Sequence, residues 1–227
     1  MTKTNWSQYG VNQEESQILE TRFEKWGIDL IDGLRAVYPE STLDQVKAVI
    51  AKGFVDRSST LRERDEARLL NPTWYQEPEM IGYAAYTDRF AKTFKGVEAR
   101  IPYLKELGVT YLHLMPLLKP RDGENDGGYA VADYRQTRTD LGTIEDLSHL
   151  AEVLHTNGIS LTLDLVLNHV ADQHEWALKA QQGVKKYQDY FYIYPNREIP
   201  DEFEKSDRKS TRLNSSHTDI SRMPSSA

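Results

Sequence analysis

Three short apolar segments, separated by amphipathic stretches, set the strongest limit on how this chain can fold. Residues 81–86, 109–115 and 159–163 are each short and apolar, as strands buried in a sheet are. Between them, apolar side chains recur every three or four residues over 94–107 and 144–154, which is typical of helices with one buried face. Parallel strands need such helical crossovers, so the pattern predicts a parallel βαβαβ sheet.

The predicted sheet fits a barrel better than a dinucleotide-binding fold. The loop after the first strand carries no Gly-x-Gly-x-x-Gly sequence, which dinucleotide-binding sheets have at that position. A (β/α)8 barrel is therefore preferred, although eight strands need roughly 250 residues. We expect an α/β protein in which residues 79–169 form the first three strands and two helices of a truncated barrel.

The chain before the sheet is predicted to be a helical domain over residues 1–78. Apolar stripes at helical spacing indicate three helices. The stripes run through Leu19, Phe23, Trp26, Leu30, Leu34 and Val37, then Leu43, Val46, Ile50 and Phe54, and the third begins at Leu61. Pro39 is expected to end the first helix, and Gly27 and Gly33 to weaken it, with a break into two helices as one outcome.

Composition restricts the classes of function. A net charge of −7 argues against nucleic acid as a partner. Neither a membrane-spanning run nor the apolar stretch of a signal peptide is seen, so we expect a cytoplasmic protein without a membrane partner. The absence of cysteine excludes disulfides and thiolate metal sites. Thirteen tyrosines and four tryptophans suit stacking on sugars, and equally suit an ordinary core.

Polar side chains gather where the third strand is predicted to end. Asp164, Asn168 and His169 follow it directly, and the carboxyl ends of parallel strands are the usual location of active sites in α/β barrels. The simpler interpretation is that Asp164 and Asn168 cap the strand and its turn, and that His169 is a surface histidine. A metal site of His169, Asp172 and His174 is disfavoured, because their spacing is not that of His-Glu-x-x-His.

Two aromatic or imidazole side chains leave more than one interpretation open. Tyr129 closes a long Gly-rich loop after the second strand, where a binding role and a core role are about equally expected. His113 lies inside the apolar second strand and is interpreted as a core histidine whose hydrogen bonds are satisfied.

Taken together, these segments resemble the α-amylase family of glycoside hydrolases (family 13). Asp164-x-x-x-Asn168-His169 is similar to the first signature region of that family, on the third barrel strand. Further motifs resemble the sucrose-using amylosucrase subfamily: Asp126-Gly-Gly-Tyr129, Tyr111-Leu-His-Leu-Met-Pro116, His174-Glu-Trp176 and Asn71-Pro-x-Trp74. The resemblance covers roughly residues 12 to 206.

The resemblance implies a role for each matching residue. His169 would donate a hydrogen bond to the glucosyl ring, Tyr129 would stack on that ring, and Asp126 would close the bottom of the pocket. Asp164 and Asn168 would organise the strand end and its loop without touching substrate. The resemblance also implies a retaining enzyme that needs no cofactor or metal, with sucrose as donor and an α-glucan as acceptor.

The resemblance further implies that part of the catalytic machinery is missing. Retaining chemistry needs two carboxylates about 5 Å apart, and in this family they follow the fourth and fifth strands. We therefore expect no catalytic residue in this fragment and no activity. Residues 170–206 would begin the loop region after the third strand. Residues 207–227, which contain six serines and no amphipathic period, resemble translated adapter sequence and are expected to be non-native.

Other functions remain open at this level. Sucrose hydrolase, sucrose phosphorylase and trehalose synthase would share most of the same motifs, and acceptor subsites outside the fragment would decide between transfer and hydrolysis. From a different class, the chain could be a non-catalytic carbohydrate-binding or interaction protein that uses the same pocket edge.

Sequencing the native locus across codon 206 tests the expectation about the C-terminal segment. We expect the reading frame to continue into a fourth strand with an Arg-x-Asp nucleophile. A native frame that ends with Ser226-Ala227 would contradict this and would favour the carbohydrate-binding alternative.

Overall fold

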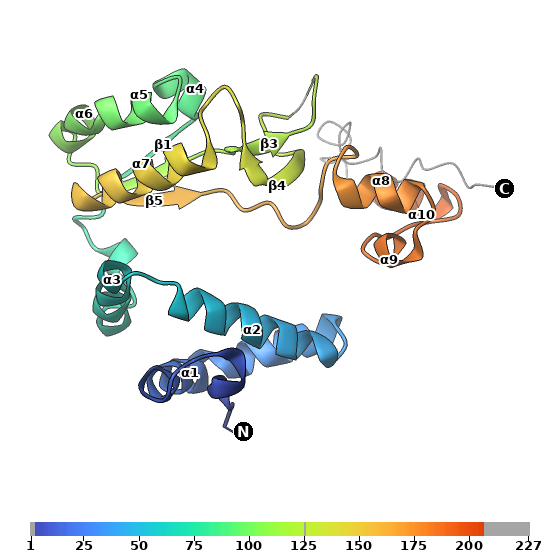
Figure 1. Ribbon diagram of the computed structural model, residues 1–227. Helices are drawn as coiled ribbons and strands as arrows, with labels where there is room; N and C mark the ends of the chain where they lie inside the picture. Colours follow the sequence, from blue (N-terminus) through green and yellow to red (C-terminus); the bar gives the residue numbers. More distant parts are fainter. Residues whose placement is uncertain (1–2, 125, 207–227) are drawn as a thin grey trace. The chain divides into compact units, whose positions relative to one another are not determined.

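The computed structural model describes residues 3–124 and 126–206 of the chain, which divides into two compact units between Tyr75 and Gln76 (Figure 1). The expected non-native segment 207–227 lies outside the described residues. In the two described ranges, no helix combines the length and the apolar character needed to cross a bilayer.

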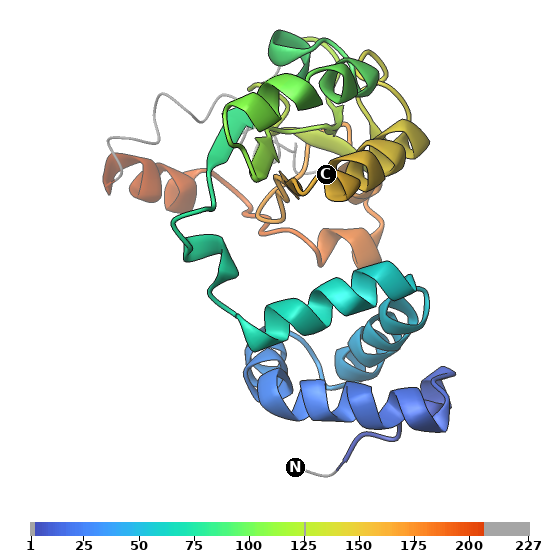
Figure 2. The same cartoon turned by 90° about the vertical axis from the view of Figure 1, so that its left-hand side faces the viewer.

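The first unit is helical (Figure 2). A short 3-10 turn η1 precedes three helices, and the first two helices pack with this turn around one core of buried side chains. The elements are η1 (Trp6–Tyr9), α1 (Gln13–Val37), α2 (Ser41–Val55) and α3 (Ser59–Leu70). The core residues are Trp6, Val11, Leu19, Phe23, Ile31, Leu43, Ala51 and Phe54.

Helix α1 differs from its prediction in two respects. It runs unbroken through Gly27 and Gly33, so the possible break is absent. The predicted stripe is also wrong in part: three of its members, Trp26, Leu30 and Val37, are 54 %, 40 % and 72 % exposed.

The buried side of α1 is shifted toward Ile31 by a close contact at Gly27. A Cβ atom on Gly27 would lie 2.8 Å from the ring of Phe23, so the ring occupies the space of the missing side chain. Leu19, Phe23, Gly27 and Ile31, four residues apart in sequence, therefore form the buried side. Counting apolar residues alone missed this, because glycine carries no apolar side chain.

Polar contacts attach α3 to the other helices. None of its described side chains is buried. The Arg62 guanidinium donates to Glu15 of α1 at 2.6 Å and to the carbonyl of Val55 at 3.0 Å, and it lies 4.8 Å from the ring centroid of Phe54. Arg57 binds both carboxylate oxygens of Asp65. These charged side chains therefore stabilise the first unit by contacts inside it.

Two substitutions in α1 test the close contact at Gly27. Gly33→Ala should stabilise the chain by about 0.5–1 kcal/mol, because alanine is the better helix former and no atom lies within 4 Å of the new methyl group. Gly27→Ala should destabilise it, because the methyl group would overlap Phe23. Urea unfolding measures both, and equal effects at the two positions would contradict the packing described here.

The second unit contains the predicted parallel sheet. Its strands pair in the order β1-β2-β5, with Leu112 of the central strand opposite Tyr83 and Leu161. The structure confirms the α/β class and the βαβαβ connection. The strands are β1 (Gly82–Ala85), β2 (Tyr111–Leu114) and β5 (Ser160–Leu163). The connecting helices are α4 (Thr87–Phe90), α5 (Phe94–Ala99), α6 (Ile101–Glu106) and α7 (Ile144–Thr156).

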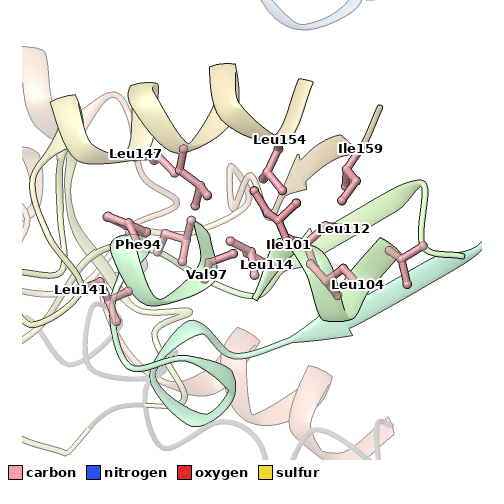
Figure 3. Close-up of a cluster of buried hydrophobic side chains, with 13 residues drawn as sticks. Phe94, Val97, Ile101, Leu104, Leu112, Leu114, Leu141, Leu147, Leu154 and Ile159 are labelled. Carbon is pink, nitrogen blue, oxygen red and sulfur yellow. The ribbon is translucent and has the colours of Figure 1, made fainter. Parts of the chain in front are cut away.

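A core of apolar side chains joins helices α5, α6 and α7 to the sheet (Figure 3). Leu112 and Leu114 of β2 are fully buried in this core, whereas Tyr111 and His113 are half-buried. Because successive side chains of a strand point to opposite faces, Tyr111 and His113 lie on the face away from these helices. The remaining core residues are Phe94, Val97, Ile101, Leu104, Val109, Leu117, Leu141, Leu147, Leu150, Leu154 and Ile159.

The helices that connect the strands differ in part from their prediction. The single helix predicted over 94–107 is two short helices that meet at Arg100, and Leu107 is exposed. At α7, Thr143 and Asp146 form a capping box.

The loop after β2 contains an antiparallel hairpin that was not predicted, β3 (Leu118–Pro120) with β4 (Val131–Thr137). After β5 follow α8 (Glu175–Gln181), α9 (Lys185–Gln188) and α10 (Glu198–Ser206).

Two leucines about one helical turn apart, Leu104 in α6 and Leu107 directly after it, test the packing of this helix. Leu104 is fully buried and Leu107 is 47 % exposed. Leu104→Ala should lower the free energy of unfolding by about 2–5 kcal/mol, because it leaves a cavity in the core. Leu107→Ala, the matched control, should cost about 1 kcal/mol or less. Urea unfolding of both variants checks this, and a comparable loss for Leu107→Ala would refute the position of the core.

Candidate functional site

The residues predicted from the strand end and the Gly-rich loop meet at one hollow. It lies where β5 ends and the chain continues without regular secondary structure. Its volume is about 490 Å³. Its lining consists of Asp126, Tyr129, Asp164, Leu165, Val166, Asn168 and His169. All five predicted site residues are therefore brought together, including the two that were expected only to support the strand end.

Asp164 connects two separate parts of the chain. One carboxylate oxygen, Oδ1, accepts a hydrogen bond from Nε2 of His113 at 3.1 Å. The other, Oδ2, accepts a hydrogen bond from the hydroxyl of Tyr129 at 3.0 Å. A charge-assisted bond at each oxygen fixes the carboxylate between strand β2 and the Gly-rich loop.

His169 is fixed by the same loop. Its Nε2 lies 3.0 Å from the carbonyl oxygen of Tyr129. A carbonyl oxygen only accepts, so Nε2 carries the proton of this bond. The backbone of this segment is also held from β4, because the hydroxyl of Tyr134 donates to the carbonyl oxygens of Val166 and His169.

Two glycines set the path of the loop that carries Asp126 and Tyr129. Gly127 and Gly128 have φ angles of 80° and 96°, a region that residues with a side chain rarely adopt. A Cβ atom would lie 2.7 Å from the hydroxyl of Tyr86 at Gly127, and 3.1 Å from Pro116 at Gly128. Asp126 itself is exposed, and its Oδ1 accepts from the backbone N–H of Ala130 at 2.9 Å, which closes the turn.

The interpretation of His113 as a core histidine with satisfied hydrogen bonds is confirmed for its hydrogen bond and wrong for its burial. Its side chain is half-buried, on the face of β2 opposite the helices, and it binds Asp164. Sequence reasoning treated the strand as buried on both faces, whereas Tyr111 and His113 alternate with Leu112 and Leu114 in the manner of a strand with one apolar face. Tyr86 and Tyr134 were also missed, since their contacts with the site come only from tertiary structure.

The disfavoured metal site does not form in the described part of the chain. His174 is 7 % exposed, and its Nδ1 accepts from the N–H of Trp176, so it caps helix α8. Burial lowers the pKa of His174 below its ordinary value. Within residues 3–124 and 126–206, no group of three or more histidine and acidic side chains is placed to hold a metal ion.

A larger hollow of about 550 Å³ lies between the β3-β4 hairpin and α8, and it is a poorer candidate. Its charged lining includes Glu175 and Lys179, which pair with each other. Its described lining has no aromatic ring, and it is formed by the hairpin and α8 rather than by the strand ends of the parallel sheet.

The hydroxyl of Tyr129 provides a test of the Asp164 contact. Burial, together with the hydrogen bond to Asp164 and the charge of that carboxylate, raises the pKa of Tyr129 to about 12. Asp164→Asn removes the negative charge that disfavours the phenolate, so the pKa of Tyr129 should fall, while burial keeps it above the ordinary value of 10.0. Carbon-13 NMR of labelled tyrosine during an alkaline titration measures the shift.

Tyr134 serves as the internal control in the same titration. Burial raises its pKa, and no charged neighbour contributes. Its titration should not respond to Asp164→Asn. An unchanged Tyr129, or an equal shift of both tyrosines, would contradict the specific contact.

Comparison with known proteins identifies the family to which the chain belongs. The family model described as "Alpha amylase, catalytic domain" matches residues 37–219. An oligo-1,6-glucosidase of Parageobacillus thermoglucosidasius is 38 % identical over 105 residues, which cover 45 % of this chain and 18 % of the relative. A 4-alpha-glucanotransferase of Thermotoga neapolitana is 36 % identical over 119 residues, which cover 49 % of this chain and 26 % of the relative.

Solved structures of related enzymes are similar over about half of the chain. A structure described as a family GH13_31 enzyme is 34 % identical, covers 52 % of this chain and 23 % of its own, and has a TM-score of 0.47. The chain thus spans about a fifth to a quarter of the length of these relatives. Because the family model matches well over half of the residues, this chain belongs to the α-amylase family of glycoside hydrolases, and its second unit is part of the (β/α)8 catalytic domain.

Proposed function

We propose that the chain is part of a retaining glucosyltransferase of the amylosucrase type, which takes glucose from sucrose and passes it to an α-glucan. The observation that carries the proposal is the hollow at the end of β5, where Asp126, Tyr129 and His169 line one wall. Sugar recognition requires polar groups that match hydroxyls beside an aromatic face, and these three residues supply both.

Each of the three residues would contribute a different contact. Tyr129 is half-buried, and its hydroxyl is already bound to Asp164, which leaves the ring face as its contribution to a ligand. Asp126 is exposed, and a carboxylate has several acceptor sites, so it can receive sugar hydroxyls. His169, held through Nε2 by the Tyr129 carbonyl, would present its ring edge to the glucosyl unit.

The chemistry itself is assigned to other parts of the whole protein. A retaining mechanism needs a carboxylate nucleophile and a second carboxyl group as acid and base. Asp164 is assigned a supporting role, because its two oxygens hold Nε2 of His113 and the hydroxyl of Tyr129 in place. We therefore propose that Asp164 and Asn168 support the site, that both catalytic carboxylates come from beyond the described residues, and that the reaction needs no cofactor.

Hydrolysis of α-glucosidic bonds is the second candidate. It is supported by the relatives named oligo-1,6-glucosidase and alpha-glucosidase, which match about half of this chain. Sucrose hydrolase, sucrose phosphorylase and trehalose synthase are sister activities on the same scaffold. The products separate transfer from sucrose hydrolysis: transfer builds glucan and releases fructose, whereas hydrolysis releases equal amounts of glucose and fructose.

Replacement of Tyr129 in the native enzyme that contains this chain tests the proposal. Tyr129→Ala should raise the KM for sucrose about tenfold, because the ring face is lost as a stacking surface. Tyr103→Ala is the control, since Tyr103 is 42 % exposed on α6 and does not line the hollow. Fructose release against sucrose concentration measures both variants, and an unchanged KM for Tyr129→Ala would refute the platform role.

The 227-residue chain alone should release no fructose and should bind sucrose too weakly for isothermal titration. If the chain alone shows a heat of sucrose binding, and Tyr129→Ala abolishes it, the alternative of a non-catalytic carbohydrate-binding protein would be favoured. Native enzyme that releases no fructose from sucrose but does release glucose from maltooligosaccharides would favour the hydrolytic candidate.

A further inference from the structure

We propose that His113 is a positioning residue of the sugar site: through Asp164 it fixes the orientation of Tyr129 without touching the ligand. The inference deepens the proposed function and rests on it in one respect, namely that Tyr129 is the surface on which the sugar stacks. The coupling itself is a property of this chain and can be measured without any sugar.

The position of His113 is set by the sheet. It pairs in register with Ala84 of β1 and Thr162 of β5, so it lies on the central strand, one residue before that strand ends. The neighbouring Leu112 and Leu114 are fully buried among the helices, which holds the backbone of β2 firmly. His113 does not line the hollow, and its side chain is 32 % exposed on the face of the sheet that points away from the helices.

From this fixed strand, hydrogen bonds run in series into the hollow. Nε2 of His113 bonds to Oδ1 of Asp164 at 3.1 Å, and Oδ2 of Asp164 receives the Tyr129 hydroxyl at 3.0 Å. The carbonyl oxygen of Tyr129 then accepts from Nε2 of His169 at 3.0 Å. The series links the rigid sheet to Tyr129 and His169, two of the three residues that would contact the sugar.

Packing alone does not fix Asp164. The segment after β5 has no regular secondary structure, and Leu165 and Leu167 are 69 % and 74 % exposed, whereas Val166 between them is buried. The direction of the Asp164 carboxylate therefore depends on its two hydrogen bonds. Without the bond from His113, the carboxylate has another rotamer open to it, and Tyr129 loses the fixed acceptor that orients its ring.

The test uses the 227-residue chain in solution, without sugar, with two variants and one control. His113→Leu removes the donor and keeps an apolar side chain, whereas His113→Gln keeps an N–H donor at a similar distance from the backbone. His149→Leu is the control: the same change at an exposed histidine of α7, which pairs only loosely with Glu98 at 3.8 Å. The readouts are the χ1 rotamer populations and the hydroxyl-proton exchange of Tyr129, measured by NMR.

We expect a single Tyr129 rotamer in the unmodified chain and in His149→Leu. In His113→Leu, Tyr129 should populate a second rotamer, and its hydroxyl proton should exchange about fivefold faster, as expected for the loss of one hydrogen bond in the series. His113→Gln should restore the single rotamer. A residue that only stabilised the sheet would not show this recovery with glutamine.

A single Tyr129 rotamer and unchanged exchange in a folded His113→Leu chain would overturn the proposal. If that variant does not fold, His113→Asn replaces it, because asparagine is polar but its amide is too short to reach Asp164. Tyr129 should then still lose its fixed rotamer. A fixed Tyr129 rotamer would again overturn the proposal. The absence of sucrose activity in the native enzyme would refute the proposed function and leave this result untouched.

Discussion

The central strand β2 is the element on which the rest of the second unit depends. Its parallel pairing with β1 and β5 carries the sheet, and its alternation directs Leu112 and Leu114 into the helical core and His113 to the opposite face. A register shift of one residue would exchange the two faces, placing an imidazole in the core and removing the partner of Asp164. The same four residues therefore specify both the packing of the barrel segment and the support of the site.

Much of this fold could be predicted, and the reason is local chemistry. The strands were visible as short apolar runs, and the apolar repeat over 144–154 predicted α7. The α1 stripe was partly wrong because Gly27 lies on the buried side, where the ring of Phe23 covers it, and no count of apolar residues can reveal such a contact. The β3-β4 hairpin was missed because its strands carry many polar side chains, flank a Gly-rich loop, and pair with an irregular register.

The site shows a similar division. Asp126, Tyr129, Asp164, Asn168 and His169 were identified from the sequence, and they line one hollow. What the sequence could not reveal is which side chain holds which. The contact of His113 with Asp164 spans 51 positions in the chain, and that of Tyr129 with Asp164 spans 35. Such distant partners depend on strand order and on the path of the glycine turn, which become known only once the sheet is assembled.

The glycine turn before Tyr129 divides its loop into a tolerant part and an intolerant part. Residues 122–124 are exposed, so the side chains at 122 and 124 can change with little loss of packing, whereas Gly123 has a φ angle of 81° and is disfavoured for substitution. Gly127 and Gly128 admit no side chain, because Tyr86 and Pro116 occupy the space. Side chains at positions 122 and 124 can therefore vary while the turn that holds Tyr129 stays constant.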